Sequence, residues 1–264
     1  MGPDWRQERV SVGGLTVDLR EKGDGPPLVI LHGEEVSRQV LPFHDSLAEQ
    51  FRVLVPSLPG VRGAELPEWV DSVDDLAYVF LDLLEQLNLG KVNLLGSGFG
   101  GWIAAEMAVR SQSHLQKLIL VGSVGIKISV PWVRDIADIF VLSYDEWIHL
   151  TWHDPAGAKI MKAPGAPGLS HEELLEALRD RQTILMLGWR PFMHNPKLRR
   201  RLSRIKVPTL VVWGESDRVV TPDYGRAFHE AIPSSKFSLI PRAGHYPHIE
   251  QPGEFVNAVK EFLR

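Results

Sequence analysis

The chain has 264 residues, 44% of them hydrophobic and 23% charged, which is typical of a globular protein. Its 29 Lys and Arg and 33 Asp and Glu give a net charge of −4, so we expect no nucleic-acid partner. The absence of cysteine excludes disulfides, thiol catalysis and cysteine-ligated metals. No apolar run approaches the ~18 residues of a membrane span, and the first residues lack the apolar stretch of a signal peptide. We therefore expect a cytoplasmic protein with no membrane partner.

The apolar pattern predicts alternating strands and helices. Residues 8–12 and 16–22 alternate apolar and polar positions around Gly13-Gly14, which is typical of a hairpin. Short apolar runs ended by turn residues predict strands buried on both faces of a mostly parallel sheet, at residues 28–31, 53–56, 92–95, 118–121, 210–213 and 237–240. Apolar positions at helical spacing predict helices at residues 72–87, 102–109 and 255–263. This alternation predicts an α/β fold with helices on both faces of a twisted sheet.

The alternation stops after residue 123. Helical patterns at residues 133–142, 145–152 and 171–187 follow one another without a strand, which predicts an inserted helical cap over 124–205. The core domain is then formed by residues 1–123 and 206–264. Pockets at such junctions are mostly apolar, so some aromatic side chains of the cap should contact substrate. The candidates are Trp132, Trp147, Trp189 and Phe192.

Three predicted strand ends carry residues that suit catalysis. Gly96 and Gly100 flank Gly98 at the spacing of a nucleophile elbow, a sharp turn from strand to helix that needs small residues. Asp217 follows a later strand, and His245 lies in the loop before the last helix. In an α/β sheet these groups meet at the carboxyl ends of the strands.

The order of these motifs resembles the α/β-hydrolase superfamily, in the capped subgroup that includes esterases and C–C hydrolases. Besides the elbow, the matching motifs are His32-Gly33, Pro59-Gly60, WGESD at 213–217 and GHYPHIEQP at 244–252. The resemblance implies an α/β-hydrolase fold in which Asp217 orients His245, the general base. It also implies an oxyanion hole formed by the backbone N–H groups of Phe99 and Glu34, no cofactor, and a small-molecule substrate.

The sequence departs from this family at the nucleophile. The elbow position that carries Ser, or sometimes Asp, is Gly98 here. Ser97 is a poor substitute, because it would put Leu95 and Phe99 at positions that must be small. Loss of a serine nucleophile costs about 10⁶ in kcat in a well-studied protease, so a fast acyl-enzyme esterase is excluded. Base catalysis, which contributes ~10²–10⁴, remains open.

Two acidic residues, Glu34 and Glu35, adjoin the expected oxyanion hole. We expect both side chains to point to solvent, so that only the Glu34 N–H matters. The alternative is a carboxylate in the cleft that acts as a second acid or repels anionic substrates. The histidines show no metal-ligand spacing, so we predict no metal site.

Three functions remain open. The first is a hydrolase of a small carbonyl or ester compound whose elbow nucleophile has been replaced by Gly98. The second is a nucleophile-independent enzyme (a lyase, oxygenase or cyclase) that uses His245 and Asp217 as its base. The third is a non-catalytic binder of a small ligand. The sequence is compatible with a monomer or a homodimer.

Overall fold

The structure is a computed structural model that describes residues 4–34, 40–161 and 163–264. Within these residues, the strands form one eight-stranded sheet of order β1-β2-β4-β3-β5-β6-β7-β8, antiparallel at β1, β2 and β4 and parallel from β4 onward. The strands are β1 (Arg6–Val12), β2 (Leu15–Lys22), β3 (Pro27–Leu31), β4 (Arg52–Pro56), β5 (Val92–Ser97), β6 (Leu115–Val121), β7 (Thr209–Gly214) and β8 (Ser235–Ile240). Each predicted strand overlaps one of these.

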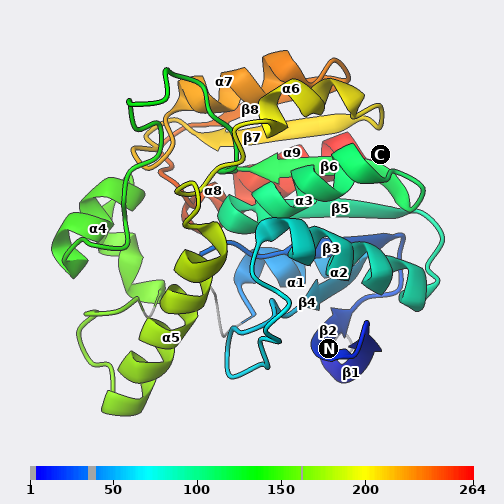
Figure 1. The fold of residues 1–264 in the computed structure, drawn as a ribbon, viewed down its shortest axis with the longest axis horizontal. Helices are drawn as coiled ribbons and strands as arrows, with labels where there is room; N and C mark the ends of the chain where they lie inside the picture. The colour runs from blue at the N-terminus through cyan, green and yellow to red at the C-terminus, as the bar shows by residue number, and fades with distance from the viewer. Residues whose placement is uncertain (1–3, 35–39, 162) are drawn as a thin grey trace.

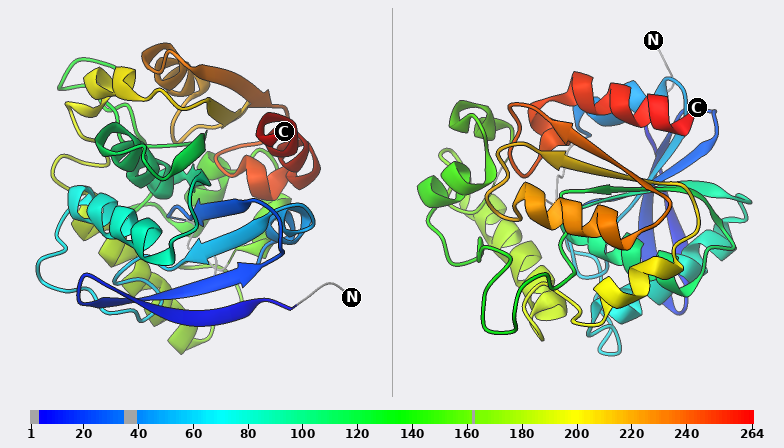
Figure 2. Two further views of the ribbon diagram at one scale, coloured as in Figure 1. Left: turned by 90° about the vertical axis from the view of Figure 1, so that its right-hand side faces the viewer. Right: turned by 90° about the horizontal axis from the view of Figure 1, so that it is seen from above.

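Helices cover both faces of the sheet (Figures 1 and 2). One face packs against α2, α3 and α7, and the other against α1 and α9, so the protein has two apolar layers. The helices are α1 (Pro42–Ala48), α2 (Val73–Leu87), α3 (Gly98–Arg110), α4 (Tyr144–Thr151), α5 (His171–Gly188), α6 (Leu198–Arg201), α7 (Pro222–Ala231), α8 (Pro247–Glu250) and α9 (Pro252–Leu263), with 3₁₀ turns η1 (Pro155–Ile160) and η2 (Leu202–Arg204).

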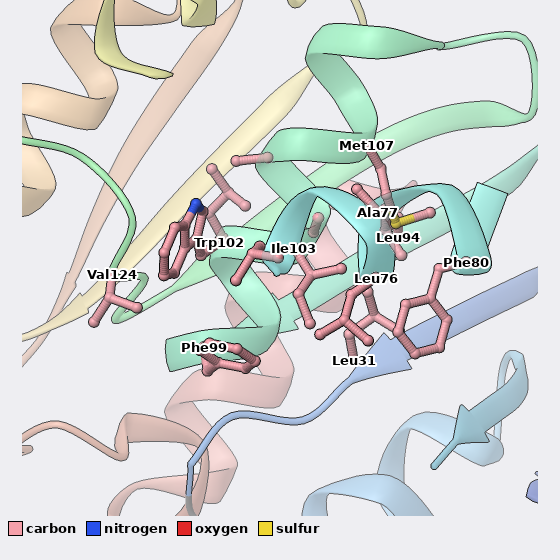
Figure 3. Packing of buried hydrophobic residues seen from close by; sticks show 14 of the residues in the cluster. Leu31, Leu76, Ala77, Phe80, Leu94, Phe99, Trp102, Ile103, Met107 and Val124 are labelled. Atoms are coloured by element: carbon pink, nitrogen blue, oxygen red, sulfur yellow. The ribbon is translucent and has the colours of Figure 1, made fainter. Parts of the chain in front are cut away.

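Helix α3 is buried along all of its length except Arg110. Phe99, Trp102, Ile103 and Met107 pack with Leu76, Ala77 and Phe80 of α2 and with Leu31 and Leu94 of the sheet, as Figure 3 shows. Small residues on the rest of α3 let its backbone approach the strands. Burial of this kind contributes about 25 cal/mol per Å² of apolar surface, so these side chains anchor α3 on the sheet.

Between β6 and β7 the chain leaves the sheet and forms α4, η1 and α5, which Figure 1 shows together on one side of the sheet. All three elements fall within residues 124–205, the range predicted for the cap. Helices α4 and α5 overlap the helices predicted at 145–152 and 171–187.

The prediction of a helix at 133–142 is wrong, because these residues form turns and bends. Asp135 accepts hydrogen bonds from the backbone N–H groups of Ile128 and Ser129 and from Lys127 Nζ, and Ala137 donates to the carbonyl of Val219. These contacts with residues outside the segment replace the bonds that a helix would form internally.

Candidate active site

The turn between β5 and α3 has the geometry of an elbow. Strand β5 ends at Ser97, and α3 begins at Gly98, whose φ is +47°. A Cβ atom on Gly96 would lie 2.7 Å from the carbonyl carbon of Gly100, and one on Gly100 would lie 2.6 Å from that of Leu31. Side chains at either position would therefore force the strand and the helix apart.

His245 and Asp217 meet beside this turn. His245 lies in the loop after β8, and its Nδ1 is 2.8 Å from Oδ2 of Asp217, which follows β7. The other carboxylate oxygen, Oδ1, accepts the N–H groups of Val219 and Val220 at 2.9 and 3.1 Å. Both side chains are at most 1% exposed. The carboxylate therefore orients the imidazole with Nε2 directed away from it.

A second carboxylate lies on the opposite side of the imidazole. Oε1 of Glu34, which follows β3, is 2.5 Å from His245 Nε2, and Oε2 accepts the Phe99 N–H at 2.9 Å. The Glu34 side chain is only 3% exposed. The expectation that it points to solvent is therefore wrong, whereas Glu35 lies outside the described residues.

Gly98 provides the room for this carboxylate. A Cβ atom built on Gly98 would overlap Glu34 Oε2 and lie 2.9 Å from Glu34 Cδ. The Glu34 carboxyl group therefore occupies the space in which a side chain at residue 98 would begin. The sequence contains a signal for this position, since a glycine at the elbow leaves space beside His245, but only the fold brings Glu34 to it.

The N–H group of Phe99 is directed at the protein's own carboxylate. The resemblance assigned this N–H, with that of Glu34, to an oxyanion hole. In the structure it binds Glu34 Oε2 at the N-terminus of α3, where the helix dipole favours negative charge. A substrate oxygen could bind the Phe99 N–H only after Glu34 moves away.

His245 lies between two negative groups, and this determines its charge. Burial acts to lower the pKa of His245, but the Asp217 and Glu34 carboxylates outweigh it and raise the pKa well above the usual 6.5. The two carboxylates therefore favour the protonated, imidazolium form of His245 in the resting site.

Glu250 of α8 supports the loop that carries His245. It accepts the N–H groups of Gly244 at 2.6 Å and His153 at 2.8 Å, and the backbone N–H of His245 donates to the Thr151 carbonyl at 2.6 Å. Burial raises the pKa of the Glu250 carboxyl, although these backbone hydrogen bonds oppose the rise. Sequence analysis did not identify Glu250, because its role depends on contacts with the chain that follows α4.

The four candidate aromatic residues lie in different places. Trp147 of α4 is 7% exposed, and its ring lies 6.2 Å from that of Tyr246, whose ring is 5.0 Å from His245. Trp132 is 83% exposed and lines a separate hollow together with Phe192. Trp189 is half exposed, and its ring packs edge-on against Phe192. Of the four, Trp147 is thus linked to His245 through Tyr246.

A cavity of about 500 Å³ is lined by residues of β1, β2, β4 and α1. Its described lining includes Ser97, the residue before Gly98, and His32, which follows β3.

Among the described residues, no group of three His, Asp or Glu side chains is placed to hold a metal ion. Within the same part of the chain, no helix is long and apolar enough to cross a membrane.

A family model, described as the alpha/beta hydrolase family, matches residues 28–259. The chain belongs to the alpha/beta hydrolase family. The 2-hydroxy-6-oxo-2,4-heptadienoate hydrolase of Pseudomonas putida is 26% identical over 278 residues, which cover 96% of this chain and 95% of that protein. A 2-hydroxy-6-oxo-6-(2'-aminophenyl)hexa-2,4-dienoic acid hydrolase of Metapseudomonas resinovorans is 27% identical over 275 residues, covering 96% and 89%.

Solved structures of hydrolases superimpose on this alpha/beta hydrolase over almost its whole length. A meta-cleavage product hydrolase from Pseudomonas fluorescens has a TM-score of 0.78 at 18% identity and covers 97% of each chain. A thermophilic esterase from Thermogutta terrifontis has a TM-score of 0.78 at 24% identity and covers 98% of each chain. These similarities show the fold.

Proposed function

We propose that this family member is a hydrolase of small organic molecules in which His245, oriented by Asp217, activates the attacking water. The observation that carries the proposal is the buried 2.8 Å contact between His245 Nδ1 and Asp217 beside the elbow. A positioned general base of this kind contributes ~10²–10⁴ to a rate. Gly98 has no side chain, so no covalent intermediate forms at that residue.

The resemblance and the names of the relatives suggest carbonyl compounds as the first substrates to test. The relatives are described as hydrolases of hydroxy-oxo-dienoates, and one structural neighbour as an esterase. A suitable panel therefore contains 2-hydroxy-6-oxo-2,4-heptadienoate and a series of nitrophenyl esters. A carbonyl oxygen could bind the Phe99 N–H only after Glu34 moves away from it. This movement also removes one of the two negative groups that raise the pKa of His245, so that the neutral imidazole can form and act as the base.

A purely binding function is less well supported. Burying an imidazole and two carboxylates has a desolvation penalty of several kcal/mol for each ion, which a binding pocket without chemistry would not need to retain. Perturbed ionisable groups in a buried cluster are more typical of catalytic sites.

The test is hydrolysis of this panel by the wild-type chain and by His245→Gln and Asp217→Asn, with exposed His171 replaced by Gln as the control. We expect turnover to fall by about 10²–10⁴ in the first two variants and to remain unchanged in the control. Equal activity in His245→Gln would disprove the proposal, and product formed without uptake of oxygen from water would indicate a lyase.

A further inference from the structure

The position and the two contacts of the Glu34 carboxylate are together typical of a reactive group. It occupies the space of the missing side chain at residue 98, its Oε1 is 2.5 Å from His245 Nε2, and its Oε2 accepts the Phe99 N–H at 2.9 Å. A nucleophile activated beside a histidine, which a third group orients, has this arrangement. Here the nucleophilic atom would come from the loop after β3 and not from the elbow.

We propose that Glu34 is the nucleophile of this enzyme and that its substrates carry a leaving group on a saturated carbon, as epoxides and alkyl halides do. The inference rests on the proposed hydrolase function and replaces its carbonyl substrates with this class. In the reaction, Glu34 Oε1 forms a bond to the carbon, and the product of the first half-reaction is an alkyl ester of Glu34.

The chemistry of carboxylates is the reason for this substrate class. Attack of a carboxylate on an ester carbonyl would form an anhydride, which is more reactive than the ester from which it came, so the step is unfavourable. Attack on a saturated carbon forms an ordinary ester, which is stable enough to accumulate and can still be hydrolysed. The position of Oε2 also matches, because the Phe99 N–H is already directed at the oxygen that becomes the ester carbonyl.

The first half-reaction balances within the site for an epoxide. The Glu34 Oε1 electron pair forms the new C–O bond, the ring C–O bond breaks, and its electrons remain on the ring oxygen. The His245 ring lies between the two carboxylates and carries a proton on Nε2, which contacts Glu34. This Nε2 proton passes to the oxygen of the opened epoxide ring. The site then contains a hydroxyalkyl ester of Glu34 and a neutral imidazole.

The second half-reaction uses the neutral imidazole as a base. Esterification removes the Glu34 charge, one of the two that raise the pKa of His245, so the histidine no longer retains its proton as strongly. His245 takes a proton from water, and hydroxide adds to Glu34 Cδ while the Phe99 N–H stabilises the charge on Oε2. The bond between Glu34 Cδ and Oε1 then breaks, so Oε1 leaves with the alkyl group as an alkoxide and the water oxygen stays on Glu34. The alkoxide takes the proton from His245, and the new carboxylic acid returns its own proton to His245. The sum is epoxide plus water to diol.

The decisive experiment is a single turnover of styrene oxide, with enzyme in excess, in oxygen-18 water. An aryl epoxide suits a site in which Tyr246 lies beside His245 and Trp147 beside Tyr246. We expect the heavy oxygen in the Glu34 carboxylate by peptide mass spectrometry and not in the diol, because water attacks Cδ of Glu34. Heavy oxygen in the diol with none on Glu34, or no turnover of styrene oxide or 1-bromobutane, overturns the inference.

Variants give an independent readout. His245→Gln should stop at the first half-reaction with 1-bromobutane, which needs no acid, and accumulate a butyl ester on the peptide that contains Glu34. Glu34→Gln should lower epoxide turnover by at least about 10³-fold, whereas Glu68→Gln, at an exposed glutamate, should leave it unchanged. Near-UV circular dichroism checks that Glu34→Gln is folded, and the label experiment needs no variant.

These outcomes separate the inference from the proposed function. If Glu34→Gln still hydrolyses dienoates or esters and the wild-type chain does not open epoxides, the hydrolase function stands and the Glu34 nucleophile is wrong. If the wild-type chain hydrolyses nothing and His245→Gln forms no adduct, both are wrong.

Discussion

A single missing side chain, that of Gly98, determines the arrangement of the site. The vacancy admits the Glu34 carboxylate, which binds an imidazolium and a backbone N–H at the start of α3. Two carboxylates around one cation leave a net negative charge in a buried place. The N-terminus of a 13-residue helix offsets part of this charge, since its dipole and its N–H groups favour an anion.

The vacancy predicts what restoring the elbow nucleophile would require. Gly98→Ser alone should gain little esterase activity, because its Cβ would overlap Glu34 Oε2. Gly98→Ser combined with Glu34→Ala frees both the space and the Phe99 N–H, and should show a burst with nitrophenyl acetate as an acyl-enzyme accumulates. Stopped-flow measurement of the burst compares the two variants. An equal burst from Gly98→Ser alone would mean that Glu34 does not obstruct the elbow.

The charge on His245 predicts how stability depends on pH. The raised pKa means that the folded state keeps a proton that the unfolded chain releases above about pH 6.5. This contribution is complete below pH 6.5 and is lost as the pH rises through the folded value, with a slope of at most about 1.4 kcal/mol per pH unit. Denaturant unfolding at a series of pH values should show this decline, and His245→Gln should lack it. Parallel profiles for the two proteins would contradict the prediction.

At the scale of elements, the contact of β5 and α3 with β3 determines where the reactive groups lie. Gly96 and Gly100 allow the backbones to approach more closely than any side chain would permit. The same contact places the Phe99 N–H opposite Glu34, which lies in the loop after β3. A small shift of α3 would therefore move the elbow relative to both Glu34 and His245.

A methyl group at the elbow tests this contact. Gly100→Ala would place a Cβ 2.6 Å from the Leu31 carbonyl carbon, and we expect a loss of about 1–3 kcal/mol with a fall in kcat. Gly253→Ala in α9 is the control, because its Cβ would meet nothing within 4 Å and its φ is not positive. Thermal unfolding and turnover are measured on both. If Gly100→Ala were as stable as the wild-type chain, the elbow would tolerate a wider separation between α3 and β3.

At the scale of the whole molecule, the chain between β6 and β7 supports the loop that carries His245. Thr151 at the end of α4 accepts the His245 N–H, and Glu250 links Gly244 to His153. The site is thus assembled from the core sheet and from the helical segment that follows β6. A change in the position of α4 would be transmitted directly to the imidazole.

Removal of Glu250 should weaken this link. Glu250→Ala leaves the N–H groups of Gly244 and His153 without their acceptor, which costs about 1–3 kcal/mol for each group that stays buried. We expect kcat to fall as His245 loses its fixed orientation, whereas Glu261→Ala on the exposed side of α9 should change neither kcat nor stability. Kinetics and denaturant unfolding provide the readouts. A stable, fully active Glu250→Ala would exclude the supporting role.

The helical segment also predicts which aromatic residue contributes to substrate binding. Trp147→Ala should raise KM, because Trp147 is packed against Tyr246 beside His245. Trp132→Ala should have a smaller effect, since that side chain is 83% exposed in a separate hollow. Steady-state kinetics on an accepted substrate compares the two. A larger rise for Trp132→Ala would place the substrate on the other side of the segment.

Local patterns were sufficient for most of the fold. Continuous apolar runs ended by turn residues predicted the parallel strands, because strands buried on both faces need apolar side chains throughout. The helix predicted at 72–87 from its apolar spacing agrees to within one residue with α2, which begins at Val73. The order of elbow, Asp217 and His245 likewise predicted which residues follow strands that meet at one edge of the sheet.

Two features depended on tertiary structure. Residues 133–142 have a helical apolar pattern, yet bonds from Asp135 to Ile128 and Ser129 and from Ala137 to Val219 hold them as turns. The side chain of Glu34 has no local preference that would bury it. Its position follows from a vacancy at Gly98 and a charge on His245, and both lie next to Glu34 only in the folded chain. Sequence alone therefore showed a glycine at the elbow position, whereas the fold determined that the Glu34 carboxylate occupies the space beside it.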